Sequence, residues 1–171
     1  MKIMIASDIH GSAYWCRKMI DAFKSEAPDK LILLGDILYH GPRNALPQEY
    51  NPQDAAAMLN EIKNYVLCVR GNCDSEVDQM MLDFPIMADY CLLYLNNKTI
   101  FAAHGHIFNL KNLPPISAGD ILLHGHTHVP ACESFGDQNI YLNPGSVSIP
   151  KQGSANSYII LSETGHEFKN L

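Results

Sequence analysis

The stretch KIMIASDIHG, residues 2–11, decides how the chain is expected to fold. Residues 2–7 are apolar and β-branched, which is typical of a buried β-strand. Asp8 and His10 follow at once, and Gly11 allows a tight turn. The same arrangement recurs along the chain: an apolar run ends in Asp, Asn or His beside a glycine.

The first half of the chain alternates expected strands with expected helices. Ser12 and Asn51 are suited to cap helices, and Pro28 and Pro52 mark a helix end and a helix start. The expected strands are residues 2–7, 30–34 and 65–70, and the expected helices are residues 13–27 and 51–64. A β-α-β-α-β order predicts a parallel sheet with right-handed crossovers.

The second half is mostly β. After a short helix at residues 75–82, a hairpin is expected around "NNK", and "FGDQ" and "ETGH" are turn signals. The expected strands are residues 89–95, 99–103, 120–123, 131–135, 138–143, 158–162 and 166–169. Two stacked sheets with helices outside bury all these strands, and no linker or repeat divides residues 1–171, so we expect a single domain.

Composition excludes several classes of protein. The chain is 47% hydrophobic and carries a net charge of −6, which is a poor basis for binding long nucleic acid but suits bound cations. Its five cysteines include no C-x-x-C pair, which favours a reducing cytoplasm over a disulfide framework. The apolar start reads as a strand rather than a signal peptide. No apolar run approaches the ~20 residues of a membrane span.

Five loops that follow apolar strands carry potential metal ligands. They are Asp8-Ile9-His10, Gly35-Asp36, Gly71-Asn72-Cys73-Asp74, His104-Gly105-His106 and His124-Gly125-His126-Thr127-His128. Each alone is also typical of a plain turn, but together they predict a site beyond the carboxyl ends of the strands. Asp, Asn and His favour Mn²⁺, Zn²⁺, Fe or Co²⁺, and so many ligands fit two ions that share a carboxylate.

The order D-x-H, G-D, G-N-C-D, H-G-H and G-H-T-H resembles the calcineurin-like binuclear metallophosphoesterases, and "GDILYHGPRNALP" and "LNPGSVSIPK" resemble bacterial phosphodiesterases of that family. The resemblance implies a four-layer α/β/β/α sandwich with two mixed sheets flanked by helices. It implies two divalent ions, most simply Mn²⁺. The implied ligands are Asp8, His10 and His128 on one ion, Asn72, His104 and His126 on the other, and Asp36 bridging them; His106 and His124 are left to orientation or packing.

The implied reaction is hydrolysis of a small phosphodiester by in-line attack of a hydroxide that bridges the ions. The catalytic candidates are Asn72, Cys73, Asp74 and His104. Cys73 stands where many relatives have a histidine that protonates the leaving oxygen. A thiol does this poorly, and nearby cations are expected to lower its pKa further, so we expect activity on esters with good leaving groups. The alternative is that Cys73 only packs under the metals.

Three further residues have two interpretations each. Asp74 either orients a neighbouring histidine or caps the helix that starts near Ser75. His40 and Arg43 either contact substrate phosphate, which suits arginine geometrically, or belong to a surface turn or a subunit contact.

Two other functions remain open from the sequence. A relative of this fold, the eukaryotic retromer subunit, acts chiefly as a protein-binding scaffold, although a scaffold has no need of a full ligand set. The second open possibility is that the protein is a phosphomonoesterase or a nuclease of the same superfamily. A symmetric dimer or tetramer fits base rates for such chains.

Overall fold

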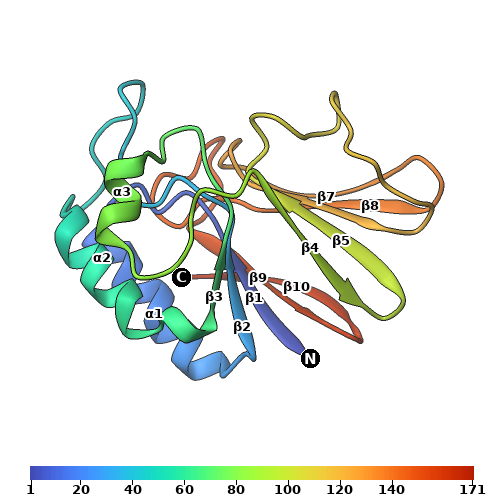
Figure 1. Cartoon of the computed structure of the whole chain (residues 1–171), viewed down its shortest axis with the longest axis horizontal. Helices are drawn as coiled ribbons and strands as arrows, with labels where there is room; N and C mark the ends of the chain where they lie inside the picture. The colour runs from blue at the N-terminus through green and yellow to red at the C-terminus, as the bar shows by residue number, and fades with distance from the viewer.

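Two five-stranded sheets stack face to face (Figure 1). The computed structural model describes all 171 residues. The first sheet has the order β10-β9-β1-β2-β3, and the second has the order β4-β5-β6-β8-β7. The strands are β1 (Lys2–Ala6), β2 (Lys30–Leu33), β3 (Val66–Cys68), β4 (Tyr90–Leu95), β5 (Lys98–Ala103), β6 (Ile121–His124), β7 (Pro130–Phe135), β8 (Asn139–Pro144), β9 (Ser157–Ser162) and β10 (Gly165–Asn170). Both sheets mix parallel and antiparallel pairs, as predicted.

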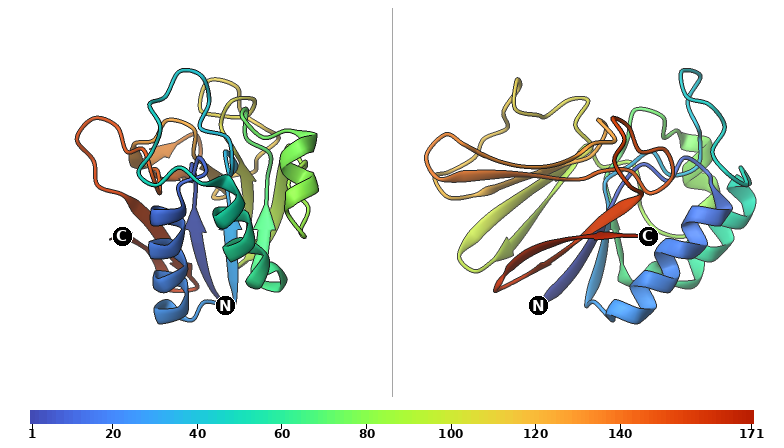
Figure 2. Two further views of the ribbon diagram at one scale, coloured as in Figure 1. Left: turned by 90° about the vertical axis from the view of Figure 1, so that its left-hand side faces the viewer. Right: turned by 180° about the vertical axis from the view of Figure 1, so that it is seen from behind.

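Three helices cover the outer face of the first sheet (Figure 2). They are α1 (Ala13–Glu26), α2 (Pro52–Glu61) and α3 (Glu76–Met81), and a 3-10 turn (Lys63–Tyr65) follows α2. The side chains of Ser12, Asn51 and Ser75 each accept a hydrogen bond from a backbone N–H of the first turn, which confirms the predicted starts. Each of these helices is too short or too polar to cross a lipid bilayer.

The apolar core has one layer on each side of the first sheet. Alternate residues of β1 point to opposite faces, so Ile3 and Ile5 pack between the sheets while Met4 and Ala6 pack under the helices. All four side chains are fully buried. The central strand is therefore apolar on both faces, and the polar segment that continues it begins at Ser7 and Asp8, both of which are buried.

The outer face of the second sheet is covered by a loop rather than a helix. Pro114, Pro115 and Gly119 lie in the segment between β5 and β6, and these residues interrupt helical hydrogen bonding. Phe108 and Leu110 of this segment pack on the sheet over the cluster Phe101, Ala103, Leu122 and Tyr141. The two-sheet sandwich is confirmed, and its fourth layer is irregular.

A cluster of charges ties the two ends of the chain to α1. The Nζ atoms of Lys2 and Lys169 lie 2.8 Å and 2.7 Å from the Glu26 carboxylate. Hydrogen bonds from Lys169 and Lys2 lower the pKa of Glu26 to about 2. The ionised carboxylate therefore stabilises the fold above its ordinary pKa of 4.5, and this contribution is lost as the pH falls from about 4.5 to about 2.

Glu26→Gln is expected to lower the free energy of unfolding by about 1 kcal/mol at pH 7. The difference from the wild type should shrink below pH 4.5 and vanish near pH 2, as measured by urea unfolding across this range. Glu167→Gln is the matched control, because Glu167 is 67% exposed and meets Lys169 only at 3.4 Å. Equal effects of the two substitutions at pH 7 would contradict the assignment.

Candidate metal centre

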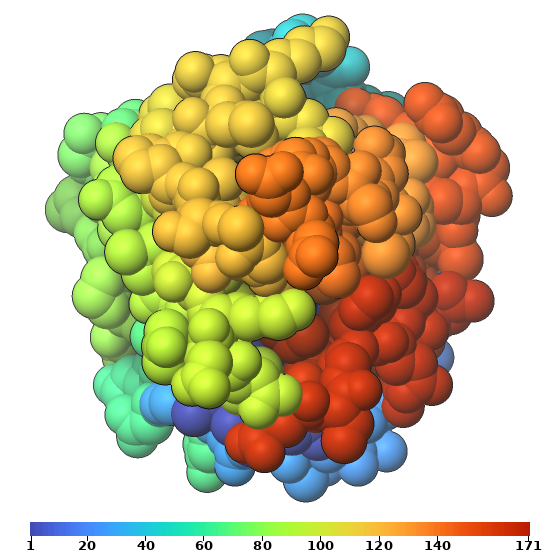
Figure 3. All heavy atoms as spheres, turned by 90° about the vertical axis from the view of Figure 1, so that its right-hand side faces the viewer, coloured from blue at the N-terminus to red at the C-terminus, as the bar shows by residue number.

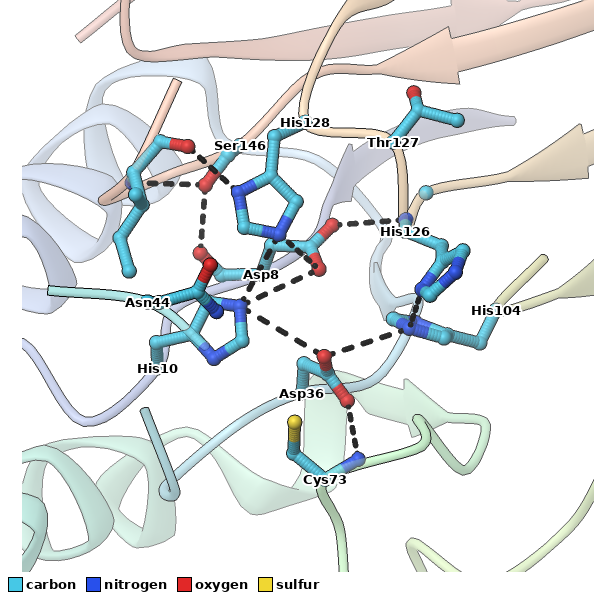
Figure 4. Close-up of polar contacts among 12 residues, drawn as sticks. Asp8, His10, Asp36, Asn44, Cys73, His104, His126, Thr127, His128 and Ser146 are labelled. Carbon is cyan, nitrogen blue, oxygen red and sulfur yellow. Dashed lines mark hydrogen bonds and ion pairs between the residues drawn. The ribbon is translucent and has the colours of Figure 1, made fainter. Parts of the chain in front are cut away.

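Seven potential ligands gather at one end of the sandwich, where five strands finish, and all of them except Asn72 are labelled in Figure 4. The loop after β1 supplies Asp8 and His10, and single side chains follow β2, β3 and β5. The loop after β6 supplies the last two. Besides Asp8 and His10, the set comprises Asp36, Asn72, His104, His126 and His128. The structure thus brings together every residue that the sequence predicted as a ligand.

One group forms around Asp8. Its Oδ1 lies 3.6 Å from His10 Nε2 and 3.3 Å from His128 Nε2. The two Nε2 atoms are themselves 3.3 Å apart. All three side chains are buried.

A second group forms around His104. Its Nε2 lies 3.1 Å from Asn72 Oδ1 and 3.1 Å from His126 Nδ1. His126 is thus turned so that Nδ1, rather than Nε2, faces the group.

Asp36 lies between the two groups. Its Oδ2 is 3.7 Å from His10 Nε2 on one side and 3.5 Å from His104 Nε2 on the other. Its Oδ1 accepts the backbone N–H of Cys73 at 2.8 Å, which fixes the orientation of the carboxylate. One oxygen of Asp36 therefore faces both groups.

The donor set fits divalent cations. His10 Nδ1, His104 Nδ1 and His128 Nδ1 each donate to a backbone carbonyl, of Tyr39, Leu34 and Ile149. A neutral ring that donates through Nδ1 carries its lone pair on Nε2, so the lone pairs of His10 and His128 face each other. The buried Asp8 Oδ1 beside them accepts no hydrogen bond. Facing lone pairs and an ionised oxygen at these distances need a cation among them.

Electrostatics give Asp8, Asp36, His10 and His126 the charge states that metal binding requires. His104 must instead lose a proton, because burial is outweighed by its hydrogen bond to Asp36 and by the charges of Asp8 and Asp36, which together raise its pKa to about 9. Burial opposes ionisation of Asp8 and Asp36, but the nearby imidazoles of His128 and His104 hold the pKa of both carboxyls below the ordinary range. Burial, reinforced by His104, lowers the pKa of His126 to about 4, and burial lowers the pKa of His10. At neutral pH these two carboxylates are ionised and these two imidazoles are neutral, as metal binding demands.

The backbone that carries these ligands is strained. Five ligand residues have positive φ: Asp8 (59°), His10 (49°), Asp36 (55°), His126 (68°) and His128 (61°). This left-handed region is uncommon outside glycine, and such residues cluster where function imposes them. A glycine completes the packing, because a Cβ at position 125 would lie 2.8 Å from Asp8 Oδ2.

Asp74 has neither of its predicted roles. Its Oδ2 accepts the backbone N–H groups of Asp36 (2.8 Å) and Gly71 (2.7 Å), and its Oδ1 accepts that of Ile37 (2.8 Å). It contacts no histidine through these bonds, and Ser75 caps α3 with its own side chain. Asp74 is a positioning residue that joins the loops after β2 and β3, because three backbone donors there need a buried acceptor.

Asp74→Ala is expected to destabilise the fold by about 3 kcal/mol or more, because it leaves three backbone N–H groups without their acceptor. Chemical unfolding measures the cost, and bound metal should fall with it because Asp36 loses its anchor. Asp78→Ala removes only the capping box of α3 and should cost about 1 kcal/mol. If the two substitutions cost the same, the anchoring role is wrong.

The other histidines of the two repeats lie in different surroundings. His124 is 4% exposed and stacks on Tyr141 with ring centroids 4.3 Å apart, so it packs. His106 is exposed, and its ring centroid lies 5.4 Å from that of His104.

A cavity of about 510 Å³ opens in front of the ligands. Of the candidate substrate contacts, Arg43 and Cys73 line it, whereas His40 does not and packs instead between Tyr39 and Tyr50. Lys151 also lines it and was not anticipated. No local pattern signals this position: Lys151 lies two residues after Ile149, whose carbonyl holds His128 Nδ1, and that contact exists only in the fold.

Cys73 is half-buried among carboxylates. Burial, followed by the charge of Asp36, raises the pKa of its thiol to about 12. The protein groups alone therefore raise the pKa of the Cys73 thiol, whereas the sequence led us to expect that nearby cations lower it. A neutral thiol with this pKa is a poor proton donor, so the expected weakness toward poor leaving groups is unchanged.

Fold and site together define a calcineurin-like phosphoesterase. The family model for the calcineurin-like phosphoesterase superfamily domain matches residues 1–166, and the chain belongs to this family.

Similar proteins include a bacterial phosphodiesterase. The chain is 49% identical over 161 residues to phosphodiesterase YfcE of Escherichia coli K12, which covers 94% of this chain and 87% of that one. The solved structure of E. coli YfcE, described as a phosphoesterase, superposes with a TM-score of 0.92 at 48% identity, over 95% of this chain and 88% of that one. Zinc-bound Vps29 of Entamoeba histolytica has a TM-score of 0.61 at 16% identity, over 100% and 98%, which shows a shared fold alone.

Proposed function

We propose that the protein is a divalent-metal-dependent phosphodiesterase that hydrolyses small phosphodiesters with good leaving groups. The observation that carries the proposal is the Asp36 carboxylate, one oxygen of which faces His10 and His104 at once. A carboxylate so placed suits a pair of ions that share it. The phosphodiesterase name of YfcE supports the same activity.

The chain's own residues hold and orient the proposed ions. Asp8, His10 and His128 would bind one, Asn72, His104 and His126 the other, and Asp36 both. Backbone carbonyls fix the rings of His10, His104 and His128, so that their Nε2 atoms need no reorganisation. When bound, two such ions supply charge that acidifies water and offsets charge on the phosphoryl oxygens.

The cavity supplies the remaining recognition. Arg43 and Lys151 are the cationic side chains in its lining, and they are suited to hold the non-bridging oxygens of a phosphodiester. Cys73 shares this cavity, and its weak acidity favours aryl esters, whose leaving oxygen needs no proton.

The wider setting completes the proposal. The metals are Mn²⁺ in the first instance, with Zn²⁺, Fe or Co²⁺ as the alternatives for a mixed O/N ligand set. All five cysteines are free, which favours action in a reducing cytoplasm. We take residues 1–171 to form one domain. The net charge of −6 favours small substrates over long nucleic acid, and a homodimer or tetramer fits base rates.

Hydrolysis of two aryl esters tests the function. Chelator-treated protein is assayed on bis(4-nitrophenyl) phosphate and 4-nitrophenyl phosphate, with and without Mn²⁺, while bound metal is counted by elemental analysis. We expect metal-dependent cleavage of the diester and far weaker cleavage of the monoester. Preferred cleavage of the monoester would indicate a phosphomonoesterase. Metal binding without turnover of either ester would favour the scaffold.

A further inference from the structure

A second cavity of about 540 Å³ lies on the outer face of the second sheet. It lies between the loop that follows β5 and the hairpin β7–β8, which meet on this face in yellow and orange (Figure 3). Its lining includes apolar side chains and two opposite charges, among them Leu110, Val129, Ala131 and Tyr141 with Lys111 and Glu133. Of the seven proposed metal ligands, His126 alone lines this groove.

The groove begins where the metal centre ends. His126 lines both cavities, and its Nδ1 faces His104, so the opposite edge of the ring points away from that group. His106 also lines the groove, 6.4 Å from His126 between ring centroids. A phosphorus held by the metal centre would therefore have one cavity on each side of His126.

The floor of the groove includes Tyr141 and His124, each only 4% exposed, whose stacked rings are fixed to the site. Tyr141 stacks on His124 at an interplanar angle of 28°, and its hydroxyl accepts the Asn143 side-chain N–H at 2.8 Å. The same amide lies 2.9 Å from the Gly125 carbonyl and 2.9 Å from Thr127 Oγ1, in the turn that carries His126. A planar apolar group that rests on this floor is thus held at a defined distance from the centre.

We propose that this groove binds the retained ester arm of the substrate, and that this arm is an aryl or nucleobase-bearing group. The inference rests on the proposed function. A phosphodiester has two arms that leave phosphorus in different directions. Cys73 lines the first cavity, and the family resemblance places the leaving oxygen beside Cys73, so the groove is left for the other arm. A monoester lacks that arm and loses the binding energy of the groove.

A substitution that fills the groove tests this directly. Ala131→Trp places an indole over the floor, and Ser134→Trp on the same strand is the control, because Ser134 lines neither cavity. The substrates are bis(4-nitrophenyl) phosphate and methyl 4-nitrophenyl phosphate, which share a leaving group and differ in the retained arm. We expect Ala131→Trp to lower the ratio of their kcat/KM values about tenfold, with Ser134→Trp leaving the ratio unchanged. An unchanged ratio in Ala131→Trp would overturn the proposal.

A binding measurement separates this proposal from the activity on which it rests. Saturation-transfer NMR with diphenyl phosphate in the presence of a chelator reports aryl contact without turnover. We expect the signal to be lost in Ala131→Trp and kept in Ser134→Trp; equal signals would overturn the groove assignment. Lack of diester turnover by the wild type would instead count against the proposed function. Val129→Phe fills the same groove and replaces Ala131→Trp if circular dichroism shows that the latter misfolds.

Discussion

Asp36→Asn is expected to lower kcat/KM for an aryl phosphodiester by about a thousandfold and to reduce bound metal from about two ions per chain to one or none. The amide keeps the shape of the carboxylate and can still accept the N–H of Cys73, so the loop should persist. What it loses is the negative charge that lies within 3.7 Å of His10 Nε2 and 3.5 Å of His104 Nε2. One oxygen of Asp36 faces both ligand groups, so we expect both ions to depend on it.

Elemental analysis after dialysis measures the metal, and steady-state kinetics in saturating Mn²⁺ measures the activity. Asp120→Asn is the control for loss of a buried carboxylate, because Asp120 accepts backbone N–H groups of Thr99 and Ser117 at the other end of the second sheet. That variant should retain its metal. An Asp36→Asn protein with two ions and wild-type turnover would contradict the shared-carboxylate arrangement.

Cys73→His is expected to raise kcat/KM for a phosphodiester with an alkyl leaving group about a hundredfold, with aryl diesters changed only a few-fold. An alkoxide must be protonated as it leaves, whereas a nitrophenolate departs unaided. A thiol is a weak hydrogen-bond donor and gives little help, but an imidazolium at the same place is a good acid. The Cα of Gly41 lies opposite Cys73, and the lack of a side chain there leaves room for the larger ring.

The comparison uses one alkyl and one aryl diester, with pH profiles for each. Cleavage of the alkyl ester should fall as the new histidine loses its proton, while cleavage of the aryl ester should not follow that titration. Cys73→Ala is the matched control and should resemble the wild type on both esters. An unchanged substrate profile in Cys73→His would leave packing as the role of this residue.

The local structure was predictable because each element carries its own signals. The helix starts at Ser12, Asn51 and Ser75 follow from side chains that can accept backbone N–H groups. The hairpin of β4 and β5 follows from Asn96 and Asn97, both of which adopt the positive φ that such turns need. The ligand loops were expected to lie close together because each follows a strand, and each strand is marked in the sequence by an apolar run.

The features that could not be predicted depend on contacts between segments far apart in the sequence, which no local pattern encodes. The acceptor role of Asp74 requires the β2 loop to lie beside it, and Lys151 reaches the cavity only because Ile149 holds His128. The irregular cover of the second sheet also departed from the helical layer expected. Pro114 and Pro115 can be seen in the sequence, but the sequence does not show that their segment covers the second sheet.

The position of β1 affects how the protein is made. This strand pairs with β2 on one edge and with β9 on the other, so the second edge has no partner until residue 162 has been synthesised. At about 5–20 residues per second, the roughly 130 residues after β2 take about 6–26 s of translation. During that time a nascent chain presents an open strand edge and the apolar face of Ile3 and Ile5. Until β9 has been made, this open edge is therefore the part of the nascent chain most exposed to wrong strand pairing.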